Sequence, residues 1–107
     1  MSALREGIEA FEEGSFSAAL VLLEPFALQG NAQAQCLLGN IYHLNLGGLG
    51  DPSKALFWYL SASQQGYSVA TNNLAGLYLS GECGVEKDAN RSKELYLKAR
   101  EQGFIHA

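Results

Sequence analysis

The chain has 107 residues, a length that predicts one domain with a modest core and argues against a two-domain enzyme. Seven basic and eleven acidic side chains give a formal net charge of −4, so the positive excess typical of nucleic-acid-binding proteins is missing. The charges are also unevenly spread, because residues 25–81, here named the low-charge segment, contain only Asp51 and Lys54.

The first 30 residues predict a helical hairpin. Apolar side chains recur at helical spacing over residues 3–13 and again over residues 16–29. Gly14 and Ser15 lie between these two segments and favour a turn followed by a helix N-cap. Pro25 removes a backbone hydrogen bond inside the second segment, so we expect a kink in that helix.

Residues 31–66 and 67–103 repeat one sequence pattern, with a one-residue insertion in the loop of the second copy. Each copy contains two segments of helical periodicity. The predicted helices span residues 32–45, 52–65, 68–80 and 89–102. The stripes expected to be buried are Ala34, Leu37, Leu38, Ile41 and Tyr42 with Ala55, Trp58, Tyr59 and Ala62, then Ala70, Leu74, Leu77 and Tyr78 with Leu95, Tyr96 and Ala99.

The second helix of each copy has recognisable start and stop signals. Asp51, followed by Pro52, is an N-cap acceptor before a residue suited to the first helical position, and Asp88 recurs at the equivalent place. Gly66 and Gly103 follow the two helices, where a residue without Cβ readily adopts the left-handed conformation that ends a helix.

Four short motifs mark the two copies. They are Ala34, Leu38, Gly39 and Tyr42, repeated as Ala70, Leu74 and Tyr78; Lys54, Ala55, Trp58 and Tyr59; Gly84, Val85 and Asp88; and a closing Gln–Gly in each copy. With these motifs, residues 31–103 resemble two Sel1-like repeats, which are relatives of the tetratricopeptide repeat. The departures from the family pattern are Ala75 for a glycine, Gly48 for a valine, Ser92 for an alanine and Leu95 for a tryptophan.

The resemblance implies a single all-α domain, an α/α superhelical solenoid of three helical hairpins. Residues 1–30 would form a degenerate leading hairpin. Residues 104–107 resemble the start of a further repeat that stops, which would leave the last hairpin without a polar capping helix.

By the same resemblance, the first helix of each hairpin lines a concave face that binds a protein or peptide. The implied interaction residues are Ile8, Phe11, Glu12, Gln33, Cys36, Asn40, His43, Leu44, Val69, Asn72, Gly76 and Leu79. Asn40 and Asn72 could clamp both the N–H and the C=O of an extended peptide, although an asparagine on a helix face is more often simply solvated.

The sequence shows no reaction centre, so we expect no enzyme, no cofactor and no metal site. The glycine-rich residues 47–50 lack the following Lys–Ser/Thr of a phosphate-binding loop, and the repeat explains them as an interhelical turn. Cys36 and Cys83 form no Cys-x-x-Cys pair and are expected to be free thiols. His43 and His106 have no partner at catalytic or metal-ligand spacing.

The favoured function is a non-enzymatic protein–protein interaction module, an adaptor or scaffold, and in a sharper version an immunity or chaperone-like partner of a bacterial effector. The alternative is a hydrolase of the penicillin-binding or β-lactamase-like Sel1 branch, whose members have a regular cysteine pair in each repeat, unlike this chain. A homodimer through the last hairpin or the uncharged central face is compatible with the first hypothesis. We expect a cytoplasmic protein with no membrane partner, because the N-terminus does not resemble a secretory signal.

The low-charge segment predicts where the partner binds. It covers the middle of the expected solenoid, and its solvent-facing positions hold amides and other uncharged groups that lose little hydration energy on contact. Replacing Asn40 or His43 with Glu is expected to weaken partner binding without unfolding the chain, whereas Trp58→Ala is expected to unfold it.

Overall fold

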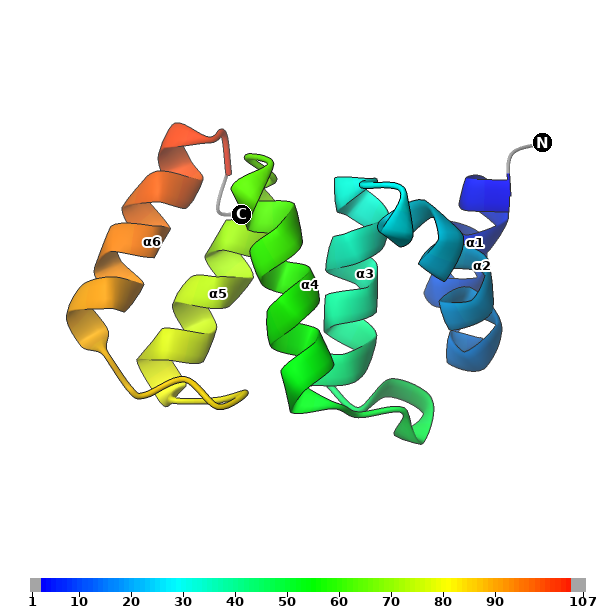
Figure 1. Cartoon of the computed structure of the whole chain (residues 1–107), viewed down its shortest axis with the longest axis horizontal. Coiled ribbons are helices and arrows are strands. Elements are labelled where there is room, and N and C mark those ends of the chain that lie inside the picture. The colour runs from blue at the N-terminus through cyan, green and yellow to red at the C-terminus, as the bar shows by residue number, and fades with distance from the viewer. Residues whose placement is uncertain (1–2, 105–107) are drawn as a thin grey trace.

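The computed structural model describes residues 3–104, which are all-α (Figure 1). The helices are α1 (Ala3–Glu12), α2 (Phe16–Leu28), α3 (Ala32–His43), the short 3-10 helix η1 (Leu46–Gly48), α4 (Pro52–Gln64), α5 (Ser68–Ser80) and α6 (Ala89–Glu101). Each α-helix packs against the next one along the chain, so three hairpins stack side by side into a solenoid of 41 × 27 × 26 Å. The predicted fold class is confirmed.

The predicted helix limits agree with the observed ones to within two residues. The largest difference is at the end of α3, where Asn45 adopts a left-handed conformation with φ of 51° and η1 follows. The helix α2 continues through Pro25, so the proline does not end it, and the kink stays a prediction. Ser15 occupies the N-cap position of α2, but its side chain makes no capping hydrogen bond. The expected further repeat over residues 104–107, with His106, lies outside the described residues apart from Phe104.

The start and stop signals of the second helices are confirmed. The carboxylates of Asp51 and Asp88 accept hydrogen bonds from the backbone N–H three residues on, at 3.2 and 2.9 Å. Gly66 and Gly103 adopt φ angles of +87° and +104°, the left-handed region in which glycine is not strained. The same capping chemistry therefore sets the limits of α4 and α6.

Two core clusters hold the hairpins together. The first contains Ala10, Ala19, Leu23, Ala27, Ala34, Leu38, Ile41, Tyr42, Ala55 and Trp58. The second contains Cys36, Tyr59, Ala62, Ala70, Leu74, Ala75, Leu77 and Leu95. Because neighbouring residues Trp58 and Tyr59 of α4 enter different clusters, α4 connects the two cores.

The close packing of α3 on α4 depends on Gly39. A Cβ at this position would lie 2.5 Å from the ring of Tyr59, so no larger residue fits without a shift. In the next hairpin Ala75 takes the equivalent place, and its carbonyl accepts a hydrogen bond of 2.8 Å from the buried hydroxyl of Ser92. This hydrogen bond accounts for one departure from the family pattern, Ser92, and nothing in the structure explains Ala75.

Candidate functional site

The predicted interaction residues differ in how far the structure exposes them. Glu12, Gln33, Leu44, Val69 and Leu79 are exposed. Ile8, Phe11, Asn40, His43, Asn72 and Gly76 are half-buried, and Cys36 is buried. Apart from Glu12, the exposed members lie on α3, on α5 or directly after α3.

Ile8 and Phe11 of α1 contribute to the core of the first hairpin. Both side chains are partly buried against the first core cluster. The ring of Phe11 meets that of Phe16 edge to face, with 5.5 Å between the ring centroids. Their contact with a partner stays a prediction.

Cys36 lies in the second core cluster, which corrects its predicted place on the exposed face. The residue is 2% exposed, and Asn73 of α5 donates a hydrogen bond to its Sγ at 3.7 Å. Burial raises the pKa of the Cys36 thiol to about 12. The reason is geometric: at about 100° per residue, Cys36 is rotated by roughly 60° from the line through Gln33, Asn40 and Leu44.

A chain of polar contacts joins α3 to α4 and α5 beside this line. The Tyr59 hydroxyl donates to Asn40 Oδ1 at 2.7 Å, and Asn73 Nδ2 donates to the same oxygen at 3.3 Å. The Tyr59 hydroxyl also lies 3.4 Å from His43 Nδ1. These contacts fix the orientation of Asn40 and His43 at the surface of α3.

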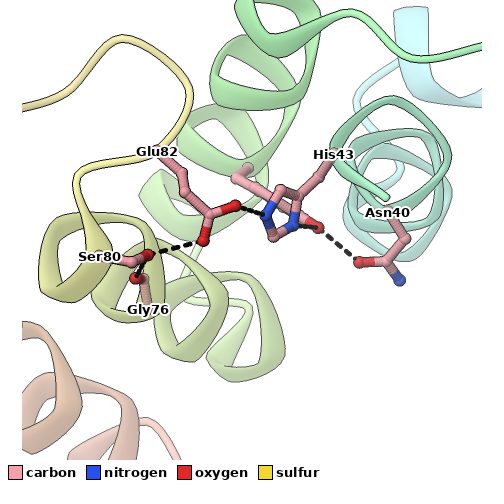
Figure 2. Close-up of polar contacts among 6 residues, drawn as sticks. Asn40, His43, Gly76, Ser80 and Glu82 are labelled. Atoms are coloured by element: carbon pink, nitrogen blue, oxygen red, sulfur yellow. Dashed lines mark hydrogen bonds and ion pairs between the residues drawn. The ribbon is translucent and has the colours of Figure 1, made fainter. Parts of the chain in front are cut away.

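The chain of contacts continues from His43 to the loop after α5 (Figure 2). His43 Nε2 lies 3.0 Å from Glu82 Oε2, and the Ser80 hydroxyl donates to Glu82 Oε1 at 2.6 Å. The hydrogen bond from Ser80 and the contact with His43 lower the pKa of Glu82. We name Asn73, Asn40, Tyr59, His43, Glu82 and Ser80 the polar chain.

Four members of the polar chain are not among the predicted interaction residues: Tyr59, Asn73, Ser80 and Glu82. Tyr59 was expected in the core, where it is 1% exposed, but its hydroxyl reaches past the core to Asn40. The one available signal was the position of Glu82, the first charged residue after the low-charge segment.

The geometry does not supply the predicted asparagine clamp. Asn40 Oδ1 already accepts from Tyr59 and Asn73, and Asn72 Oδ1 is buried without a partner among the described residues. Neither oxygen is therefore open to the N–H of a bound peptide. The predicted clamp is therefore wrong. Tyr59 and Asn73 already use Asn40 Oδ1, and burial shields Asn72 Oδ1 from a partner.

The polar chain does not have the order of a catalytic triad. In a triad, a histidine stands between the nucleophilic hydroxyl and the carboxylate. Here Glu82 stands between Ser80 and His43, and both ring nitrogens of His43 have neighbours in the chain. Among residues 3–104, no group of three or more His, Cys, Asp or Glu side chains could hold a metal ion. Both cysteines are free, as predicted.

Two of the predicted interaction residues, Leu44 and Val69, are exposed apolar side chains. Leu44 is 57% exposed and Val69 is 39% exposed, and no charged residue lies within four positions of either one.

Within the described part of the chain, no helix is long and apolar enough to cross a membrane.

Comparison with known families finds two Sel1 repeats, over residues 32–67 and 68–104. Over 82 residues the chain is 40% identical to chitin synthase regulatory factor 3 of Schizosaccharomyces pombe, a match to 76% of this chain and 8% of that protein. These relatives agree with the repeat that the motifs indicated.

Two solved structures share the fold. One is a protective antigen present in uropathogenic Escherichia coli strains that displays an SLR fold, with a TM-score of 0.84 at 28% identity over 95% of this chain and 22% of that one. The other is a Sel1 repeat protein from Oxalobacter formigenes, with a TM-score of 0.81 at 33% identity over 94% of this chain and 41% of that one. The chain thus spans less than half the length of each relative.

Proposed function

Because the chain belongs to the Sel1 repeat family, we propose that it is a non-enzymatic module that binds another protein as an adaptor or scaffold. One observation carries the proposal: the exposed residues of α3 and α5 in the low-charge segment are apolar or uncharged polar groups. The name of the fission yeast relative, a regulatory factor, supports a regulatory role.

The proposed contact surface, named the central surface, consists of Gln33, Asn40, Leu44 and Val69. Removing water from such a surface costs less than removing it from lysine and glutamate side chains. The polar chain leaves only the amide nitrogen of Asn40 to donate to a partner, and it holds this group in place before binding. A preorganised donor loses less conformational entropy on binding than a mobile one.

In its finer form, the proposal is that the partner is a bacterial effector that this protein neutralises or escorts in the cytoplasm. Two free cysteines, one of them half-buried, support a reducing compartment. A second copy of the chain on the central surface is a further form of the same proposal, and light scattering distinguishes the two by the mass of the particle.

The test uses Gln33→Glu and Val69→Glu as a double variant. Both residues are exposed at the second helical position of α3 and α5, where a carboxylate favours the helix N-terminus, so the fold should be kept. Asn40→Glu and His43→Glu are less suitable, because both residues belong to the polar chain and their loss would also disturb the fold.

Ser53→Glu is the matched control, since Ser53 is exposed at the second helical position of α4. The wild type and the control are expected to co-purify one protein from the source cell in stoichiometric amount, and the double variant is expected to lose it. Equal capture by all three, or no stoichiometric protein with any of them, contradicts the central surface. Hydrolysis of nitrocefin by the purified wild type would instead favour the hydrolase alternative.

A further inference from the structure

A pocket of about 330 Å³ lies on the outer side of the third hairpin. Its walls include Leu79 of α5 together with Ser92, Lys93, Tyr96, Leu97 and Arg100 of α6. In Figure 1, α6 stands at one end of the row of helices with α5 as its neighbour. Leu79 and Leu97 are each 49% exposed, so the pocket has an apolar part that is open to solvent.

The first Sel1 repeat, over residues 32–67, shows which element covers this side of the second helix of a repeat. Tyr59 and Tyr96 occupy equivalent positions, so the same side of α4 contains Ser63, the equivalent of Arg100. Ser63 is buried against α5, and its hydroxyl lies 2.6 Å from that of Thr71. Tyr59 packs into the second core cluster with residues of α5. The equivalent side of α6 therefore lies at the position that a helix covers in the preceding repeat.

The charge of this side differs between the two repeats. Leu56 of α4 corresponds to Lys93 of α6, and Ser63 corresponds to Arg100. Lys93 and Arg100 are exposed, and neither has an ion-pair partner among residues 3–104. A helix with an entirely apolar face would strip water from both cations without pairing them, which is unfavourable. Seven residues apart on one helix, the two cations are separated by about 10 Å along its axis.

We propose that this side of α6, together with Leu79, binds an acidic amphipathic helix of another protein. The bound helix runs antiparallel to α6, as α5 runs antiparallel to α4. Its apolar side chains cover Tyr96 and Leu97, and two carboxylates about two turns apart pair with Lys93 and Arg100. The site goes beyond the proposed function, because it lies on the outer side of the third hairpin and not on the central surface.

A stapled helical peptide serves as the probe. Its sequence is that of residues 68–80 with the changes T71E and Y78E, because Thr71 meets the α4 equivalent of Arg100 and residue 78 lies two turns further on. The unmodified stapled peptide is the control, and circular dichroism establishes that both are helical. Titrated into the isotope-labelled full chain at about 0.15 M salt, where distant charges are screened, the acidic peptide is expected to shift the signals of Leu79, Tyr96 and Leu97.

Charge reversal makes the test specific. The double variant Lys93→Glu and Arg100→Glu should bind the acidic peptide at least about tenfold more weakly, the effect of losing two charge-assisted contacts. Lys98→Glu is the matched control, since Lys98 is exposed on α6 but does not line the pocket. A peptide with T71K and Y78K instead should bind the double variant and not the wild type.

Several results would overturn the proposal. One is equal binding of the acidic and the unmodified peptide, or no binding of either helical peptide. Another is a set of shifted signals on α3 and at Val69 instead of at the pocket. If the free chain associates with itself and Lys93→Glu with Arg100→Glu breaks up the particle, the occupant is a second copy and not the helix of another protein. These results are independent of the central surface, which Gln33→Glu and Val69→Glu test.

Discussion

The helices α4 and α6 occupy the same place in consecutive repeats but meet different surroundings. α4 lies between α3 and α5, whereas α6 packs against α5 at one end of the row (Figure 1). The only charged residue of α4 is Lys54, while α6 contains Arg91, Lys93, Glu94, Lys98, Arg100 and Glu101. The repeat sets the backbone and the core positions of both helices, and the remaining positions differ according to what each helix contacts.

Single positions also show that the contacts between hairpins are neutral, whereas the outer side of α6 is charged. Between the first two hairpins, buried Gln35 donates to the carbonyl of Ala27 at 3.0 Å. Between the next two, the hydroxyls of Ser63 and Thr71 lie 2.6 Å apart. On α6, the residue equivalent to Ser63 is the exposed cation Arg100. Internal junctions therefore contain neutral hydrogen bonds, and the outer side of α6 presents charge.

The largest expected effect comes from the core position that α4 and α6 share. Trp58 and Leu95 are equivalent and are 9% and 5% exposed. Trp58→Ala should lower the free energy of unfolding by about 3–5 kcal/mol, enough to unfold a small domain, because a large cavity opens in the first core cluster. Leu95→Ala should cost less, at about 2–3 kcal/mol. Urea denaturation measures both, and an equal or larger loss for Leu95→Ala would contradict the larger contribution expected from Trp58 of α4.

The next effect concerns the approach of α3 to α4. Gly39→Ala should destabilise the chain by about 1–3 kcal/mol, because the new Cβ would overlap the ring of Tyr59. Gly76→Ala is the matched control on α5, where the nearest atom to a new Cβ, the Tyr96 hydroxyl oxygen, is 3.9 Å away. That variant should be neutral or more stable by about 0.4–1 kcal/mol, since alanine restricts the unfolded chain. A loss of equal size in both variants would contradict the close approach at Tyr59.

Local sequence signals predicted the helices, but they did not predict the contacts between hairpins. Asp51 and Asp88 could be assigned as caps because an N-cap depends on residues within one turn of itself. The use of Asn40 Oδ1 by Tyr59 and Asn73 depends on how three helices are rotated relative to one another, which a repeat period does not specify. For the same reason, no local signal indicated that the asparagine clamp lacks free acceptors.

A smaller effect tests whether the polar chain stabilises α4 more than α6, which has no equivalent hydrogen bond among the described residues. Tyr59→Phe removes a hydroxyl that donates to Asn40 at 2.7 Å, and it should lower the free energy of unfolding by about 0.5–1.5 kcal/mol. Tyr96→Phe removes the equivalent hydroxyl, which has no hydrogen-bond partner among the described residues, so it should cost less. Thermal unfolding of both variants measures the difference, and a reversed order would mean that the Tyr59 contact adds nothing to stability.

The smallest effect depends on pH and concerns His43 and Leu79, which are equivalent in their repeats. His43 is tied to Glu82, whereas Leu79 lines the open pocket. Because the pKa of Glu82 is lower in the folded chain than the ordinary value for a glutamate, its ionised form stabilises the fold above that ordinary value. The contribution disappears as the pH falls through the lowered pKa. Glu82→Gln should therefore cost about 0.2–1 kcal/mol at pH 7, the range for exposed pairs, and nothing in strong acid.

Glu86→Gln is the control for this pH effect, since Glu86 is exposed in the same loop and has no ion pair in the described part of the chain. Its urea midpoint should follow that of the wild type at every pH. If the deficit of Glu82→Gln persists unchanged in acid, hydrogen bonding by the side chain and not its charge joins the loop to α3. The His43–Glu82 contact would then resemble the neutral hydrogen bonds of the internal junctions. The two repeats would differ in charge only on the outer side of α6.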